Sequence, residues 1–174
     1  MKKKIIFISV VLLTFLVVSQ CYAERSSGMR LSSLAFENNT SIPFKFTCQG
    51  EGVNPPLVIE NIPKNTQSLA LIVDDPDAPG GASAPFVHWV VYDIPVIDRI
   101  KENSVPGKQG SNNGGGIDYV GPCPPSGTHR YFFKIYALDK IFNLDEGISK
   151  SSLESAMLGH ILDQAELVGL YKKK

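Results

Sequence analysis

The sequence predicts a mostly β protein, an antiparallel β-sandwich with a helix near its C-terminus. Three observations support this fold class. Short segments rich in β-branched and aromatic residues recur along the chain, proline and other turn residues bound them, and no helical segment separates one from the next. Strands that follow one another through turns favour antiparallel pairing over alternating β-α-β units.

The predicted strands lie between residues 31 and 138, each with turn residues at both ends. They are Leu31–Phe36, Phe44–Thr47, Leu57–Ile59, Leu69–Asp74, Val87–Ile94 and Tyr131–Leu138. The Gly- and Asn-rich segment 107–116 falls between the last two of these strands. We expect it to be the least structured stretch, and a long loop inside a compact domain is often functional.

One helix is predicted near the C-terminus. Ser151 and Glu154 have the spacing of a capping box, which marks the start of a helix. The apolar series that continues this helix is Leu153, Met157, Ile161 and Leu162. A last short strand is predicted at Leu167–Tyr171, and Lys172–Lys174 form a solvated tail.

The first 23 residues have the pattern of a secretory signal peptide. Lys2–Lys4 precede the apolar run Ile5–Val18, and cleavage is expected after Ala23. The run is about 14 residues long, short of the roughly 20 that span a bilayer. We therefore expect a periplasmic or secreted mature domain, residues 24–174, without a transmembrane segment. In a competing interpretation, Cys21 is the lipid-modified first residue of a lipoprotein.

The charge of the mature domain differs from that of the full chain. The 174 residues carry 17 basic and 17 acidic side chains. Three of the basic ones lie in the predicted signal peptide, so the mature domain keeps 14 against 17, a net charge of −3. A mildly acidic domain without a Lys/Arg cluster does not attract a phosphate backbone, so no nucleic-acid partner is expected. About 150 residues suit one domain with its own core.

Polar residues stand where predicted strands begin or end. Asp75 and Asp77 follow the strand Leu69–Asp74, while His88 and His129 stand at the starts of later strands. The prolines of the Asp-Pro-Asp stretch restrict its backbone to non-helical conformations. If these strand ends share one rim of the sandwich, Asp75, His88 and His129 form a small polar site.

Three chemistries fit this set of residues. Two His and one Asp are the ligands of a two-His-one-carboxylate metal site, although their spacing is irregular. A His–Asp pair could instead activate Ser126, which does not stand in a nucleophile elbow. In the third chemistry, His side chains and backbone N–H groups bind phosphate or carboxylate oxygens. Each residue could instead have only a structural role, as Asp-Pro-Asp does where it forms a turn. The glycines at 114–116 lack the rest of a P-loop and are interpreted as a flexible stretch. No cofactor is expected.

Apart from Cys21, the chain has one pair of cysteines, Cys48 and Cys123. In an oxidising, exported compartment the two can form a disulfide. Two buried free thiols are the alternative. Sequence reasoning leaves both alternatives open.

Several ordered motifs cover nearly the whole predicted mature chain. They are Phe46–Gly50, Asn54–Leu57, Asp74–Pro79, His88–Pro95, Gly121–Tyr131, Tyr136–Asp139 and a C-terminal helix containing His160–Leu162. Together they resemble the phosphatidylethanolamine-binding protein family, also called the Raf kinase inhibitor protein family, in its bacterial branch.

The resemblance implies an antiparallel Greek-key β-sandwich with a few peripheral helices and a small anion-binding pocket at one rim. The residues that it assigns to the pocket and its wall are Asp75, Asp77, His88, Tyr119, Cys123, Pro124, His129 and Tyr131. Two positions depart from related sequences. The animal branch has a glycine in place of Cys123, and many bacterial members carry a longer insertion where this chain has Thr128.

The function that the resemblance implies is a non-enzymatic, exported module. Its expected ligand is a small molecule or protein partner with a phosphate, phospholipid head-group or carboxylate, and a homodimer is left open. One alternative is a protease or kinase inhibitor acting through surface loops, and another is a metal-dependent enzyme using Asp75, His88 and His129. If the two His must be charged to hold an anion, binding weakens as the pH rises through their pKa values.

Overall fold

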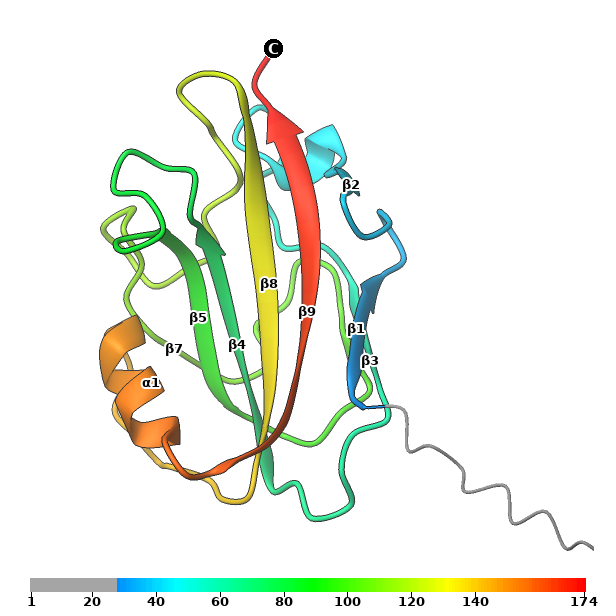
Figure 1. Ribbon diagram of the computed structural model, residues 1–174, viewed down its shortest axis with the longest axis vertical. Coiled ribbons are helices and arrows are strands. Elements are labelled where there is room, and N and C mark those ends of the chain that lie inside the picture. The colour runs from blue at the N-terminus through cyan, green and yellow to red at the C-terminus, as the bar shows by residue number, and fades with distance from the viewer. Residues whose placement is uncertain (1–27) are drawn as a thin grey trace, which may run out of the picture.

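A computed structural model of the chain describes residues 28–174, which form two packed β-sheets and an α-helix (Figure 1). The predicted signal peptide, its cleavage site and Cys21 lie outside the described residues. Within residues 28–174, no helix is long and apolar enough to cross a membrane.

The larger sheet has six strands in the order β2-β9-β8-β4-β5-β7. These are β2 (Thr40–Ser41), β4 (Ser68–Asp75), β5 (Phe86–Ile94), β7 (Lys108–Gln109), β8 (Thr128–Leu138) and β9 (Ile161–Lys172). All neighbours pair antiparallel except β2, which runs parallel to β9. β4 is buried along its whole length because it lies in the middle of the sheet.

The smaller sheet has the order β1-β3-β6, with β1 (Arg30–Ser33), β3 (Leu57–Glu60) and β6 (Arg99–Ile100). It packs on one face of the larger sheet, and apolar side chains such as Ile59 and Phe133 form the core between them. Helix α1 (Lys150–Met157) covers part of the opposite face, where Leu153 and Met157 pack against that sheet (Figure 1). The predicted β-sandwich with a helix near the C-terminus is therefore confirmed.

The predicted strand Phe44–Thr47 is wrong. Phe44–Phe46 form a short 3₁₀ helix, η1, which follows Pro43. The hydroxyl of Thr47 donates to the carbonyl of Phe44 at 2.8 Å and stabilises this turn, while Phe46 is buried in the core. Side-chain hydrogen bonding of Thr to nearby backbone competes with strand pairing, which explains the error.

The predicted helix near the C-terminus exists, but both of its ends differ. Its N-cap is Ser149, whose hydroxyl accepts from the N–H of Ser152, so Ser151 lies inside the helix. The helix ends at Met157, and Gly159 then adopts a positive φ of 77°. A glycine in the left-handed region is a common way to end a helix. The predicted C-terminal helical residues Ile161 and Leu162 belong instead to β9.

The segment 107–116 is more ordered than expected. Lys108–Gln109 form β7 beside β5, and Gly110 continues the contact by donating its N–H to Val90. The carboxamide oxygen of Asn112 accepts the N–H groups of Gly114 and Gly116. An Asn side chain bonded to the following backbone organises a turn, so the Gly-rich stretch has a defined conformation.

Candidate functional site

Two residues singled out in the sequence, Asp75 and His129, form a buried hydrogen-bonded pair. They come from the neighbouring strands β4 and β8, and only 3% of Asp75 and 8% of His129 are exposed. Nδ1 of His129 donates to Oδ2 of Asp75 at 2.8 Å, because a carboxylate oxygen accepts. This bond fixes the orientation of the ring and leaves Nε2 of His129 for another partner.

His88 reaches the same region through a β-bulge. Val73 pairs with Trp89 and Asp74 pairs with Val87, so His88 has no partner on β4. Bulges next to functional sites commonly redirect a side chain. Here the ring of His88 packs edge-on against Tyr131, with ring centroids 5.1 Å apart.

The protonation of His88 follows from its surroundings. Nδ1 donates to the carbonyl of Val120 at 2.6 Å, because a carbonyl oxygen only accepts. Burial lowers the pKa of His88 below its usual 6.5, since a charged imidazolium loses hydration there. The neutral ring leaves Nε2 as a hydrogen-bond acceptor.

Tyr131 has a buried hydroxyl whose proton has no acceptor in the described part of the chain. The residue is 0% exposed. Burial raises the pKa of Tyr131, the charge of Asp75 raises it further, and the backbone of Cys123 beside the hydroxyl opposes the rise. Tyr131 is therefore a protonated donor. Leaving such a group unpaired costs about 1–3 kcal/mol, and a ligand atom that accepts from this hydroxyl would remove that cost.

Tyr119 belongs to the wall of the site. Its hydroxyl donates to the carbonyl of Phe46 at 3.2 Å, and its ring packs edge-on against Trp89 at 5.7 Å. The indole of Trp89 donates in turn to Gln109 at 2.7 Å. Tyr119 thus fixes the segment before β8 against η1, and its hydroxyl already has an acceptor.

Asp77 forms an ion pair with Arg130. Its carboxylate accepts from the backbone N–H of Arg130 and from two guanidinium nitrogens, at 2.9, 2.9 and 2.6 Å. These hydrogen bonds lower the pKa of Asp77 to about 2. The N–H of Asp77 also donates to Asp75 at 2.8 Å. Asp77 therefore holds the loop after β4 onto β8 and positions Asp75.

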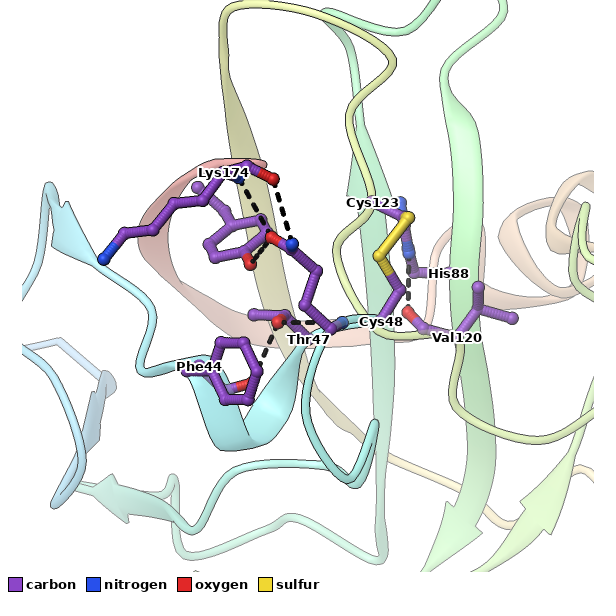
Figure 2. The surroundings of a disulfide bond; sticks show 9 residues. Phe44, Thr47, Cys48, His88, Val120, Cys123 and Lys174 are labelled. Atoms are coloured by element: carbon purple, nitrogen blue, oxygen red, sulfur yellow. Dashed lines mark hydrogen bonds between the residues drawn. A yellow bond between two sulfur atoms is a disulfide. The ribbon is translucent and has the colours of Figure 1, made fainter.

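A disulfide closes the wall of the site. The sulfurs of Cys48 and Cys123 are bonded at 2.06 Å and link the turn after η1 to the segment before β8 (Figure 2). The N–H of Cys48 also donates to the carbonyl of Pro122 at 3.1 Å. Pro124 is buried in the same segment.

Gly121 allows the two backbones of this wall to approach. A Cβ at this position would lie 2.8 Å from the carbonyl carbon of Thr47 and 2.9 Å from the nitrogen of Cys48. Real Cβ atoms do not approach backbone this closely. The short distance between the segments therefore requires glycine.

The end of β9 supports the same turn. The carboxamide oxygen of Gln49 accepts from the hydroxyl of Tyr171 at 2.6 Å and from the N–H of Lys174 at 3.0 Å (Figure 2). Its amide nitrogen donates back to the carbonyl of Lys174 at 3.1 Å. Sequence reasoning missed both Gln49 and the carbonyl of Val120. The signal for Gln49 was its place in the motif Phe46–Gly50, whereas a backbone carbonyl leaves no signal in a sequence.

The other face of the larger sheet carries a separate polar cluster. Asp74 is 1% exposed and forms ion pairs with Lys134 and Lys150. An open cavity of about 1130 Å³ lies on this face and is lined by Asp74, Phe132 and both lysines, among others. None of the residues that the sequence assigned to the site lines it.

The geometry bears on the two enzymatic alternatives. Nδ1 of His88 and Nδ1 of His129 bond Val120 and Asp75, which leaves Nε2 of each ring for another partner, as in metal-binding and catalytic His residues. Across residues 28–174, no group of three His, Cys, Asp or Glu side chains is placed to hold a metal ion. Ser126 is exposed in the turn before β8.

Known proteins with similar sequences include two relatives named UPF0098 protein. The one from Methanothermobacter thermautotrophicus is 45% identical over 153 residues, which span 83% of this chain and 99% of the relative. The one from Chlamydia muridarum is 44% identical over 149 residues, again 83% of this chain and 99% of the relative. The name states no activity.

Three solved structures are also similar to this chain. A putative phosphatidylethanolamine-binding protein homologue from Chlamydia trachomatis is 42% identical, with a TM-score of 0.81 over 84% of this chain and 99% of the other. YbcL of E. coli is 25% identical, with a TM-score of 0.77 over 85% and 100%. A carboxypeptidase Y inhibitor, in complex with its proteinase, shares only the fold, at 15% identity and a TM-score of 0.54.

Residues 32–172 match the family described as Phosphatidylethanolamine-binding protein, which includes nearly all of the described chain and every residue of the site. The chain therefore belongs to the phosphatidylethanolamine-binding protein family.

Proposed function

We propose that this protein binds the phosphate or carboxylate group of a small molecule or a partner protein, without catalysing a reaction on it. The observation that carries the proposal is the buried hydroxyl of Tyr131, whose proton has no acceptor within residues 28–174. It lies beside His88, and the charge of Asp75 influences the pKa of both residues. His129 is bonded to Asp75, so the four side chains share one small region.

The hydrogen-bonding groups of this region suit a partly protonated oxyanion. Tyr131 offers a donor, and neutral His88 offers an acceptor at Nε2. Nε2 of His129 adds a further hydrogen-bonding atom, since Nδ1 of this ring is already bonded to Asp75. A phosphate monoester that keeps one P–OH group can accept from Tyr131 and donate to His88.

The charge of the molecule is consistent with short-range recognition. The predicted mature domain has a net charge of −3, so it does not attract anions over long distances. Selectivity must come from donors within the site. The predicted signal peptide supports a periplasmic or secreted location, where phospholipid head-groups and small phosphate esters are accessible ligands.

Calorimetric titration with inorganic phosphate and with phosphoethanolamine tests the proposal. Tyr131→Phe removes the donor and should weaken binding by more than about tenfold, the lower end for one hydrogen bond to a charged group. Tyr136→Phe is a matched control, because Tyr136 lies on the same strand and packs against the α1 side of the sheet. Absence of heat with native protein, or equal affinities for native protein and Tyr131→Phe, would refute the anion site.

Inhibition of a protease or kinase through surface loops is the alternative of a different class. An inhibitor of this kind does not need the hydroxyl of Tyr131. In a panel of proteases and kinases, inhibition that survives Tyr131→Phe would favour this alternative. No inhibition by native protein, together with phosphate binding, would favour the anion-binding module.

A further inference from the structure

The disulfide between Cys48 and Cys123 joins two surface residues. Both cysteine residues are exposed. Exchange requires an incoming thiolate to reach one of the sulfurs, so exposure decides which disulfides react. Exposed disulfides are typically the labile or regulatory ones, whereas disulfides that only stabilise a fold resist reduction.

The bond joins the two segments that form the wall of the site. One is the turn after η1, which contains Cys48 and Gln49. The other is the segment before β8, which contains Val120 and Cys123 (Figure 2). Val120 accepts the Nδ1 proton of His88 and also donates its own N–H to the backbone carbonyl of His88. The backbone of Cys123 lies beside the hydroxyl of Tyr131.

The noncovalent links between these segments are few. The structure has the hydrogen bond from Cys48 to Pro122 and the one from Tyr119 to Phe46. The turn after η1 has independent support, because Gln49 is bonded to Tyr171 and Lys174. Asp118 is bonded to Asn112 and Gln109, and Val120 is bonded to His88, so residues 118–120 are also held independently. Loss of the disulfide therefore leaves both anchors in place and loosens residues 121–124, where the backbone of Cys123 lies beside the hydroxyl of Tyr131.

We propose that the Cys48–Cys123 bond is a thiol-exchange site whose opening weakens ligand binding at the site of Tyr131 and His88. The second half of this inference rests on the proposed anion-binding function. The reacting partner is a small-molecule thiol or dithiol, or a protein that carries a reduced dithiol.

A thiolate of the partner attacks one sulfur of the disulfide, the Cys48–Cys123 bond breaks, and the departing cysteine takes up a proton from solvent. A second thiol of the partner then attacks the mixed disulfide and releases the other cysteine, which is protonated in turn. The protein disulfide gains two electrons and becomes two thiols, while the partner is oxidised to its own disulfide.

Reduction of the disulfide and binding of phosphate should influence each other by the same factor. We expect phosphate to bind the oxidised protein at least about fivefold more tightly than the reduced protein, the lower end of typical coupling between two sites. By linkage, saturating phosphate then favours the oxidised form by the same factor. A factor of five corresponds to about 21 mV in the reduction potential of a two-electron couple.

The experiment equilibrates the native protein in dithiothreitol redox buffers, with and without saturating inorganic phosphate. Alkylation of free thiols and mass spectrometry give the reduced fraction. Calorimetry gives the phosphate affinity of each form. The double variant Cys48→Ser, Cys123→Ser should bind phosphate like the reduced protein and ignore dithiothreitol. Cys48→Ala, Cys123→Ala replaces it if the first variant does not fold.

Two results would overturn the inference. One is a disulfide that dithiothreitol opens only in denaturant. The other is equal phosphate affinity of both forms, with a midpoint of reduction that phosphate does not move. If the oxidised protein binds no phosphate, the anion-binding function fails on its own. Hydrogen exchange then decides the redox half: faster exchange of the amides of Gly121 and Cys123 on reduction supports it, and unchanged exchange contradicts it.

Discussion

Asp74 and Asp75 are consecutive in β4, and their carboxylates lie on opposite faces of the larger sheet. Asp75 accepts from His129 at 2.8 Å on the face of the smaller sheet, whereas Asp74 is paired with Lys134 and Lys150 on the face of α1. Side chains alternate across a strand, so one dipeptide serves two unrelated purposes. Asp75 orients the site, and Asp74 fixes the start of α1 to the sheet.

Asp74→Asn should lower the free energy of unfolding by about 3 kcal/mol, because two partly buried ammonium groups lose their counter-charge. Urea unfolding measures this loss, and phosphate titration should show unchanged affinity. Glu154→Gln is the matched control, since Glu154 is exposed and 3.7 Å from Lys150, and its loss should cost less than about 0.5 kcal/mol. A weakened phosphate affinity in Asp74→Asn would show that the two faces are coupled.

Removal of the disulfide should destabilise the fold without abolishing it. The bond closes a loop with a sequence separation of 75, and the chain-entropy estimate for that length is roughly 4 kcal/mol. The double variant Cys48→Ser, Cys123→Ser should therefore unfold at lower urea than the oxidised protein. Addition of dithiothreitol should bring the native protein to the stability of the variant. Equal stabilities of the two proteins without reductant would contradict this expectation.

Gly121→Ala should separate the two segments of the wall. The new methyl group would lie within 3 Å of the backbone of Thr47 and Cys48, which cannot move without breaking the turn after η1. Overpacking of this kind costs about 1–3 kcal/mol and should also leave part of Cys48 and Cys123 unbonded, visible by thiol alkylation. Gly116→Ala is the control, because its nearest neighbour is 4.0 Å away. A fully oxidised, equally stable Gly121→Ala would argue against close backbone approach.

The sequence predicted the fold class and most strands because short β-branched segments carry a local signal. It failed where one or two residues decide the local conformation. Thr47 and Pro43 turn an apolar run into η1, and Gly159 ends α1 before Ile161. The two-residue strands β2, β6 and β7 were missed because their pairing depends on neighbours distant in sequence.

For the site, the sequence identified the side chains and not their partners. The sequence placed Asp75 and His129 near each other only because both stand at strand ends. The hydrogen bond between them could not be predicted from that alone. The Asp-Pro-Asp motif does not distinguish Asp75 from Asp77. The hydrogen bonds between Asp77 and Arg130 could therefore not be predicted from it. The alternatives for the cysteines also stayed open, since residues 75 apart give no local indication of contact.

The protonation of His88 leads to a prediction on stability. Its pKa in the folded protein is below 6.5, so the unfolded chain binds a proton that the folded one resists. The stability associated with neutral His88 is complete above pH 6.5 and declines as the pH falls from 6.5 to the lower folded pKa. His88→Gln should therefore make the free energy of unfolding less dependent on pH between 7 and 5. An unchanged pH dependence would mean that folding does not shift the pKa of His88.

The pairing of Asp77 with Arg130 should be lost at lower pH. The pKa of Asp77 is about 2 in the folded protein against 3.8 as its ordinary value, so folding favours the ionised carboxylate. The resulting stability is present above pH 3.8 and is lost as the pH falls from 3.8 through about 2. Because Arg130 is half-exposed, we expect a contribution of about 1 kcal/mol, reduced further by salt.

Asp77→Asn tests this contribution by urea unfolding at pH 7 and near pH 2. At pH 7 the variant should be less stable than native protein, because a neutral carboxamide holds the guanidinium more weakly. Near pH 2 the difference should shrink, since native Asp77 is then about half protonated. Arg130→Gln should behave in the same way if the pair is responsible. A difference that persists at low pH would assign the effect to the hydrogen bond with the backbone of Arg130 rather than to charge.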